Sequence, residues 1–322
     1  MLVPDCNIKI TNTKGEIITF NYCKQIDIER SSKTLTNTCK IVLPRKLKLK
    51  DRSLTDVFQR GSKIEVRLSY LGYEERLEFI GFIAHVDLTI PVVLHCEDNM
   101  WLLKQVQVNR SWEQVSLNKV LHDIIPADIK YECEDVQLGN FRALKLSVTQ
   151  VLDVLGNLGL YSYFRGETLC VGFVYPPKWA GDANYEATYD MHINVAEDNL
   201  EYRKAEEVAL RVEVISMFDN GKMIKYKSGD ANGELHVIHA NPNTPMEGLK
   251  SVAEKALEKM RVTTMKGTIT SFGIPYCDHG FIANIIDDEY SERNGKYFID
   301  KVTIRFGVDG FRRIIELGKS AA

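Results

Sequence analysis

Hydrophobic and polar residues alternate with a period of two through most of the first hundred residues. Ile26 and Ile28 share one face with Arg30, and the same alternation recurs in GSKIEVRLSY (61–70) and VVLHC (92–96). This period is typical of half-buried antiparallel strands. LGY at 71–73 predicts a hairpin turn. The segment is therefore predicted to be an all-β unit of short strands, as in barrels and sandwiches.

The period changes to a helical one in the middle of the chain. SLNKVLHDII (116–125) predicts a helix with Ser116 as its N-cap, and a second helix is predicted at 148–158 with Gly159 near its end. YSYFRGETLCVGF (161–173) predicts a hairpin that turns at Arg165 and Gly166. Together these elements predict a small α+β module near 106–190.

The last third returns to strands. Alternation over 208–214 leads to Asp219-Asn220-Gly221, a strong hairpin-turn signal. One helix is predicted at 249–260, and further strands follow to the C-terminus. Residues 61–96 and 280–317 share a loose pattern of glycine, apolar strand, turn, arginine and apolar strand. This indicates a weak internal repeat, although any two antiparallel meanders could match as loosely.

The composition indicates the class of protein but points to no catalytic or binding site. The 322 residues include 44% hydrophobic and 26% charged side chains, which is typical of a folded globular chain of two or three domains. Lys and Arg number 41 against 44 Asp and Glu, and this balance disfavours stable nucleic-acid binding. No apolar run approaches the roughly 18 residues of a membrane span, and MLVPDCNIKI lacks a secretory layout. We therefore expect a soluble chain with no membrane binding.

The seven cysteines stand far apart and include no C-x-x-C pair. Cys39, Cys96 and Cys170 lie in apolar strand-like runs, where cysteine behaves as a small buried hydrophobe. A disulfide framework is typical of short, cysteine-dense secreted chains instead. Reduced thiols in a cytoplasmic compartment are the favoured interpretation.

Charge divides the chain into three parts. Residues 1–105 carry 16 basic and 13 acidic side chains, residues 106–200 carry 7 and 13, and residues 201–322 carry 18 of each. The acidic middle part is therefore predicted to be a domain of its own. The predicted domains are 1–105, 106–195 and 196–322. The basic run from Arg45 to Arg52 is interpreted as a solvated loop rather than a nucleic-acid site.

Candidate catalytic and metal sites are weak. The carboxylates of 287–289 follow one another in the chain, so they point in different directions and suit an exposed turn. Cys277 and His279 are too close in sequence for the geometry of a nucleophile and its base. His236 and His239 lie on a predicted strand, where residues three apart face opposite sides. No cofactor, metal site or enzymatic activity is predicted, and the pattern favours a scaffold.

The C-terminal stretch from Lys266 to Gly318 carries a set of glycine, aromatic, proline and arginine positions: Phe272, Gly273, Pro275, Gly280, Arg293, Gly295, Tyr297, Gly310, Arg312 and Arg313. With this set the stretch resembles the closing domain of the central baseplate hub of contractile phage tails, and the resemblance places these residues at structural and interface positions. This family includes late-control D proteins and the hub half of VgrG spikes. IDIERSSKTLTNTCKIVLPR and HCEDNMWLLKQ are similar to the first barrel of such hubs, and 151–173 is similar to their intervening module.

The resemblance implies an α+β, mainly β fold in which two tube-type antiparallel β-barrel domains flank a small α+β module. It also implies a homotrimer whose six barrels match a sixfold tail tube, with a spike protein, a tail tube protein and other baseplate proteins as partners. Such a hub would belong to a virion or injection-device particle assembled in the bacterial cytoplasm. Because the chain ends at LGKSAA, a separate spike protein is expected.

The adjacent arginines and the carboxylates lead to two further expectations. Of the adjacent Arg312 and Arg313, one should face inward and pair with a carboxylate, because neighbours on a strand face opposite sides. The alternative function is a phage-associated cell-wall hydrolase or carbohydrate-binding module, which would need paired carboxylates or a metal in one cleft.

Overall fold

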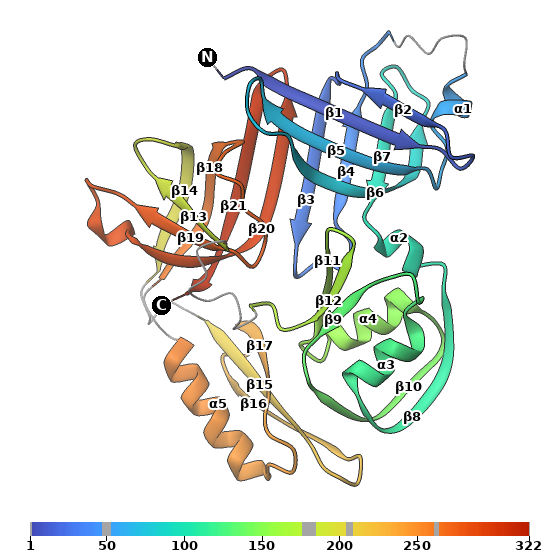
Figure 1. Ribbon diagram of the computed structural model, residues 1–322. Coiled ribbons are helices and arrows are strands. Elements are labelled where there is room, and N and C mark those ends of the chain that lie inside the picture. The colour runs from blue at the N-terminus through green and yellow to red at the C-terminus, as the bar shows by residue number, and fades with distance from the viewer. Residues whose placement is uncertain (1, 47–52, 176–184, 204–208, 261–263, 322) are drawn as a thin grey trace.

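The computed structural model describes residues 2–46, 53–175, 185–203, 209–260 and 264–321 (Figure 1). The fold is α+β and mainly β, as predicted, and one thirteen-stranded sheet dominates it. Its N-terminal strands are β1 (Pro4–Thr11), β2 (Ile17–Phe20), β3 (Gln25–Ser31), β4 (Thr38–Val42), β5 (Lys63–Tyr70), β6 (Arg76–Asp87) and β7 (Val93–Glu97). Its C-terminal strands are β13 (Glu186–Asp190), β14 (Val195–Arg203), β18 (Thr264–Phe272), β19 (Ile282–Ile286), β20 (Gly295–Gly307) and β21 (Gly310–Ser320).

The two halves of this sheet repeat one strand order. The N-terminal half runs β2-β1-β5-β6-β7-β4-β3 in space, and the C-terminal half runs β13-β19-β20-β21-β18-β14. The edge strand β2 has no counterpart in the C-terminal half; without β2, both orders are 1-4-5-6-3-2 when the strands of each half are numbered along the chain. The meanders β5–β7 and β19–β21 hold equivalent places and correspond to the repeat at 61–96 and 280–317. One difference is that β1 pairs antiparallel with β5, whereas β13 pairs parallel with β19.

Strands β3 and β20 join the two halves edge to edge. They pair antiparallel from Gln25 opposite Gly307 to Ser31 opposite Lys301. Strand β20 also pairs with β19 and β21, so the sheet branches at β20. Over the described residues this pairing closes no ring, and the two predicted barrels correspond to two similar halves of one branched sheet. One apolar core runs through both halves, from Cys6 to Leu317. The halves are therefore held together by main-chain hydrogen bonds and by shared burial.

The middle of the chain has a core of its own. It contains α2 (Met100–Leu103), β8 (Gln107–Ser116), α3 (Leu117–Ile124), β9 (Tyr131–Cys133), β10 (Gln137–Ser147), α4 (Val148–Gly156), β11 (Tyr161–Arg165) and β12 (Thr168–Gly172). Both predicted helices are confirmed, and the hydroxyls of Ser116 and Ser147 accept the backbone N–H groups of Lys119 and Gln150. The ribbon of β8 and β10 was not predicted, because its bulges interrupt the apolar alternation.

A three-stranded sheet with one helix is inserted between β14 and β18. It contains β15 (Leu210–Met217), β16 (Met223–Gly229), β17 (Glu234–His239) and α5 (Met246–Met260). Val212 and Val214 pack there against Leu249 and Ala253. The predicted helix begins three residues earlier than expected, at Met246. Figure 1 shows this unit and the middle module on the same side of the large sheet.

Two short helical segments complete the described elements, α1 (Leu54–Val57) and the 3-10 turn η4 (Ser291–Arg293). Within the described ranges, no helix combines the length and apolarity needed to cross a bilayer. Most of the basic run at 45–52 falls outside the described residues.

Candidate functional site: the junction of the two β halves

Arg312 and Arg313 occupy successive positions on β21 and face opposite ways. Arg313 is fully buried, with its Nη2 atom 2.7 Å from Glu78 Oε1. The same nitrogen donates to the Gly273 carbonyl at 3.1 Å. Arg312 is half-buried, and its guanidinium lies 4.9 Å from the centre of the Phe272 ring. The inward arginine therefore links β21 to β6, which belongs to the other half of the sheet.

Glu78 reaches this position through a β-bulge. Val66 on β5 pairs with Phe79 and Arg67 pairs with Leu77, so Glu78 is the extra residue of β6. As a result Glu78 and Phe79 are both buried, although simple alternation would place one of them outside. Sequence reasoning missed Glu78 for this reason.

Arg30 on β3 adds a second buried cation. Its Nη2 lies 3.3 Å from Glu78 Oε2, and its Nε lies 3.4 Å from Asp278 Oδ1. Burial disfavours the ionised Asp278, but the charge of Arg30, together with that of Arg165 and the backbone N–H of His279, outweighs burial and holds the pKa of Asp278 below its ordinary value. Two arginines and two carboxylates thus neutralise one another inside the junction. We call Arg30, Glu78, Asp278 and Arg313 the junction cluster.

The middle module contacts the junction through His279 and Arg165. Arg165 on β11 donates from Nη2 to the His279 carbonyl at 2.9 Å. The His279 ring is 1% exposed and lies edge-on to Tyr163, with ring centres 4.6 Å apart. Burial lowers the pKa of His279 to about 4, so the ring is neutral at neutral pH. Neither ring nitrogen has a hydrogen-bond partner among the described residues.

Gly273 allows the closest approach of the two halves. The Tyr70 hydroxyl donates to the Phe311 carbonyl and accepts the Gly273 N–H, each at 3.0 Å. A Cβ atom on Gly273 would overlap the Phe311 ring, so a side chain here would force that ring to move. Tyr70 of the N-terminal half therefore forms hydrogen bonds at the end of β18 and at the start of β21 in the C-terminal half.

The sequence-predicted site residues fall into two groups. One group lies at the junction, where β18 ends and β21 begins, and consists of Phe272, Gly273, Gly310, Arg312 and Arg313. The connection from β18 to β19 carries Pro275 and Gly280, and the Gly280 N–H donates to the Ile299 carbonyl at 2.7 Å. Arg293, Gly295 and Tyr297 form a separate group between η4 and β20.

Asp287, the most enzyme-like carboxylate of the sequence, is used to hold a turn. Its Oδ1 atom accepts the backbone N–H groups of Glu289 and Tyr290 at 3.0 and 2.9 Å. These bonds, first that of Tyr290, lower the pKa of Asp287. Arg293 lies 3.4 Å from its second oxygen. The Asp287 carboxylate therefore stabilises the loop between β19 and β20 through these bonds.

The histidine pair considered for a metal does not converge either. His239 Nε2 is 2.7 Å from the Leu158 carbonyl oxygen, while His236 lies near Glu234. Across the described ranges, no group of three His, Cys, Asp or Glu side chains is arranged to hold a metal ion.

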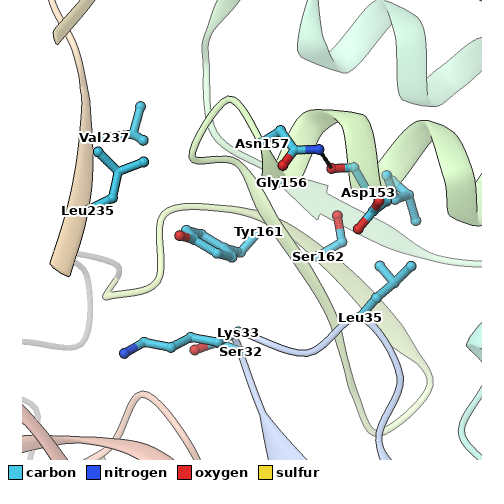
Figure 2. A pocket seen from close by; sticks show the side chains of 11 residues that line it. Ser32, Lys33, Leu35, Asp153, Gly156, Asn157, Tyr161, Ser162, Leu235 and Val237 are labelled. Carbon is cyan, nitrogen blue, oxygen red and sulfur yellow. Dashed lines mark hydrogen bonds between the residues drawn. The ribbon is translucent and has the colours of Figure 1, made fainter. Parts of the chain in front are cut away.

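A pocket of about 290 Å³ lies between the β3–β4 loop, α4 with β11, and β17 (Figure 2). Leu235 and Val237 form one wall and face Tyr161 and Asn157. Asp153 is the single carboxylate of the described lining, so the pocket lacks the carboxylate pair that glycoside hydrolysis uses. Its lining residues are Ser32, Lys33, Leu35, Leu152, Asp153, Gly156, Asn157, Tyr161, Ser162, Leu235 and Val237.

Solved structures of similar fold include tail and secretion-system proteins. A tail protein from Neisseria meningitidis MC58 matches with a TM-score of 0.64 and 14% identity, over 98% of this chain and 96% of that one. The 43 kDa tail protein of prophage MuSo2 from Shewanella oneidensis matches with a TM-score of 0.65 and 12% identity, over 99% of both chains. This chain has the fold of these tail proteins.

An E. coli component of the type VI secretion system, described as structurally similar to T4 bacteriophage tail proteins, also matches. Its TM-score is 0.58 at 10% identity, over 97% of this chain and 76% of that one. No protein-family model matches the sequence, and no curated protein does at a significant level. The likeness therefore lies in the fold.

Proposed function

We propose that this chain is the structural hub of a phage tail or phage-like contractile injection device. It trimerises to give pseudo-sixfold symmetry and joins a spike protein to the tail tube, with other baseplate proteins around it. The observation that carries the proposal is the fold match with two tail proteins over nearly the whole length of each chain. The particle is assembled in the bacterial cytoplasm.

The repeated strand order supports the symmetry in this proposal. Each chain carries two β halves of one topology, so three chains around an axis present six such halves. A threefold object with six similar units can meet a sixfold ring without a mismatch in contacts. The two tube-type barrels, and the domain limits at 105 and 195, belong to the same proposal. The glycines and arginines near β21 act in it as structural residues at the contact between halves.

The oligomeric state of the purified full-length chain tests the proposal. One chain has a mass of 36.7 kDa, so a trimer has about three times that mass in light scattering. Negative-stain class averages are expected to show a ring with a central lumen and six lobes in threefold symmetry. Circular dichroism on the same sample establishes that the chain is folded. A folded chain that stays monomeric, alone and with its spike and tube proteins co-expressed, would overturn the proposal.

The hydrolase or carbohydrate-binding alternative gains no support from the described residues. Asp287 is bonded into a turn, and the carboxylates of Glu78 and Asp278 face buried arginines. Clearing of peptidoglycan by the purified chain, abolished in Asp287→Ala and Glu289→Ala, would favour this alternative instead.

A further inference from the structure

Two cysteine thiols lie in contact near the start of the chain. Cys6 Sγ and Cys23 Sγ are 4.0 Å apart. Cys6 lies on β1 and is 5% exposed, whereas Cys23 is half-buried in the turn that leads from β2 into β3. Both side chains pack against the core of the large sheet. Neither has a place in the junction cluster or in the proposed assembly.

We propose that Cys6 and Cys23 form a reversible disulfide within one chain when the protein meets a peroxide. The bond ties β1 to the start of β3, the strand that joins the two halves of the sheet through β20. This link lies inside a single chain, so it does not depend on the proposed hub function.

The contact between the two sulfurs suits disulfide formation. The two thiols share a hydrogen bond in which either Sγ atom can be the donor. One thiolate attacks a peroxide, and the neighbouring thiol resolves the product. Cys23 is the more exposed member of the pair and opens it to a small oxidant.

The reaction balances with hydrogen peroxide as the two-electron oxidant. The thiolate of one cysteine attacks one peroxide oxygen, the O–O bond breaks, and hydroxide leaves, so that this cysteine becomes a sulfenic acid. The Sγ atom of the other cysteine then attacks that sulfur, the S–O bond breaks, and the S–S bond forms. The thiol proton leaves with the oxygen as water. Overall, two thiols and one peroxide give one disulfide and two waters.

A second cysteine pair in the same sheet provides an internal comparison. Cys39 on β4 lies directly opposite Cys96 on β7. Both are at most 2% exposed, and burial raises the pKa of each thiol. A buried thiol of high pKa is inert. Proximity in the fold is therefore shared by the two pairs, whereas partial exposure belongs to the Cys6–Cys23 pair alone, through Cys23.

Peptide mapping of the oxidised protein tests the proposal directly. The folded, reduced full-length chain is treated with hydrogen peroxide, the remaining thiols are alkylated, and trypsin digestion follows without reduction. Cys6 and Cys23 fall in separate tryptic peptides, 1–9 and 15–24. We expect these two peptides to be recovered as one linked species that dithiothreitol separates. We also expect the Cys39 and Cys96 peptides to be recovered alkylated.

Variants extend the test to the consequence for stability. The bond closes a short loop in the unfolded chain, so oxidation should raise the thermal midpoint by about 5 °C. The rise should persist in Cys39→Ser and vanish in Cys23→Ser. Three results would overturn the proposal. Peptides 1–9 and 15–24 stay unlinked after peroxide treatment, they become linked only in urea, or they become linked more slowly than the Cys39 and Cys96 peptides. Peptide mapping of the wild-type protein decides between these results even where a variant folds poorly.

Discussion

Replacing Arg313 by methionine tests whether the buried junction holds the two β halves together. Arg313 is fully buried and lies 2.7 Å from Glu78, which is itself about 1% exposed. Methionine keeps much of the side-chain volume, so the change removes the charge and its hydrogen bonds with little new cavity. What remains is a buried Glu78 whose nearest cation is Arg30, at 3.3 Å.

The expected loss follows from these contacts. Removing one partner of a buried ion pair costs about 3–5 kcal/mol, because the other charge stays out of water without compensation. The carbonyl oxygens of Gly273 and Cys277 also lose donors at 3.1 and 3.4 Å. Arg30 keeps part of the compensation, so we expect a loss near the lower end, about 3 kcal/mol in the free energy of unfolding.

Urea denaturation followed by circular dichroism measures this loss, and the chain offers a matched control. Arg312→Met, one residue away on the same strand but half-buried, should cost less than about 1 kcal/mol. Glu78→Leu combined with Arg313→Met should cost less than the two single losses together, because it leaves Arg30 with Asp278. A loss below about 1 kcal/mol for Arg313→Met, or strictly additive losses, would refute the reasoning.

Two further predictions concern the same junction. The unfolded chain protonates His279 near pH 6.5, whereas the folded chain, with its pKa of about 4, does not. Stability should therefore fall by about 3 kcal/mol as the pH drops between these values. His279→Phe should remove this contribution of about 3 kcal/mol from the pH dependence, as measured by urea titration at each pH. A pH dependence equal to that of the wild type would contradict the low pKa of His279 in the folded chain. Gly273→Ala should lower the thermal midpoint by the equivalent of about 1–3 kcal/mol, because its Cβ meets the Phe311 ring. The matched Gly156→Ala, with nothing within 4 Å of its Cβ, should be neutral or stabilising, and equal effects of the two changes would disprove the close-approach argument.

The local elements of this fold could be predicted from the sequence because their signals are local. Alternation placed β3, β5 and β7, a capping serine placed the start of α3, and helical spacing of apolar residues placed α4. The repeat at 61–96 and 280–317 indicated two similar halves before any strand order was known. The burial of Arg30 could also be predicted in part, because the alternation places Arg30 on the same face as Ile26 and Ile28.

The candidate site needed the tertiary structure, because its members meet through contacts that no sequence window contains. The inward turn of Glu78 depends on a one-residue bulge against β5, which shifts the alternation of β6 locally. Arg30 and Arg313 are 283 positions apart in the chain, and the pairing of β3 with β20 brings their strands together. The same holds for Cys6 and Cys23, whose contact arises where β1 passes the turn into β3.

The sequence by itself thus determined which segments become strands and helices, because period and capping act over a few residues. The tertiary structure decided which strands pair, which charges are buried together and which thiols touch. Those outcomes depend on the register between distant segments, and a shift of one residue would turn each of these side chains to the other face.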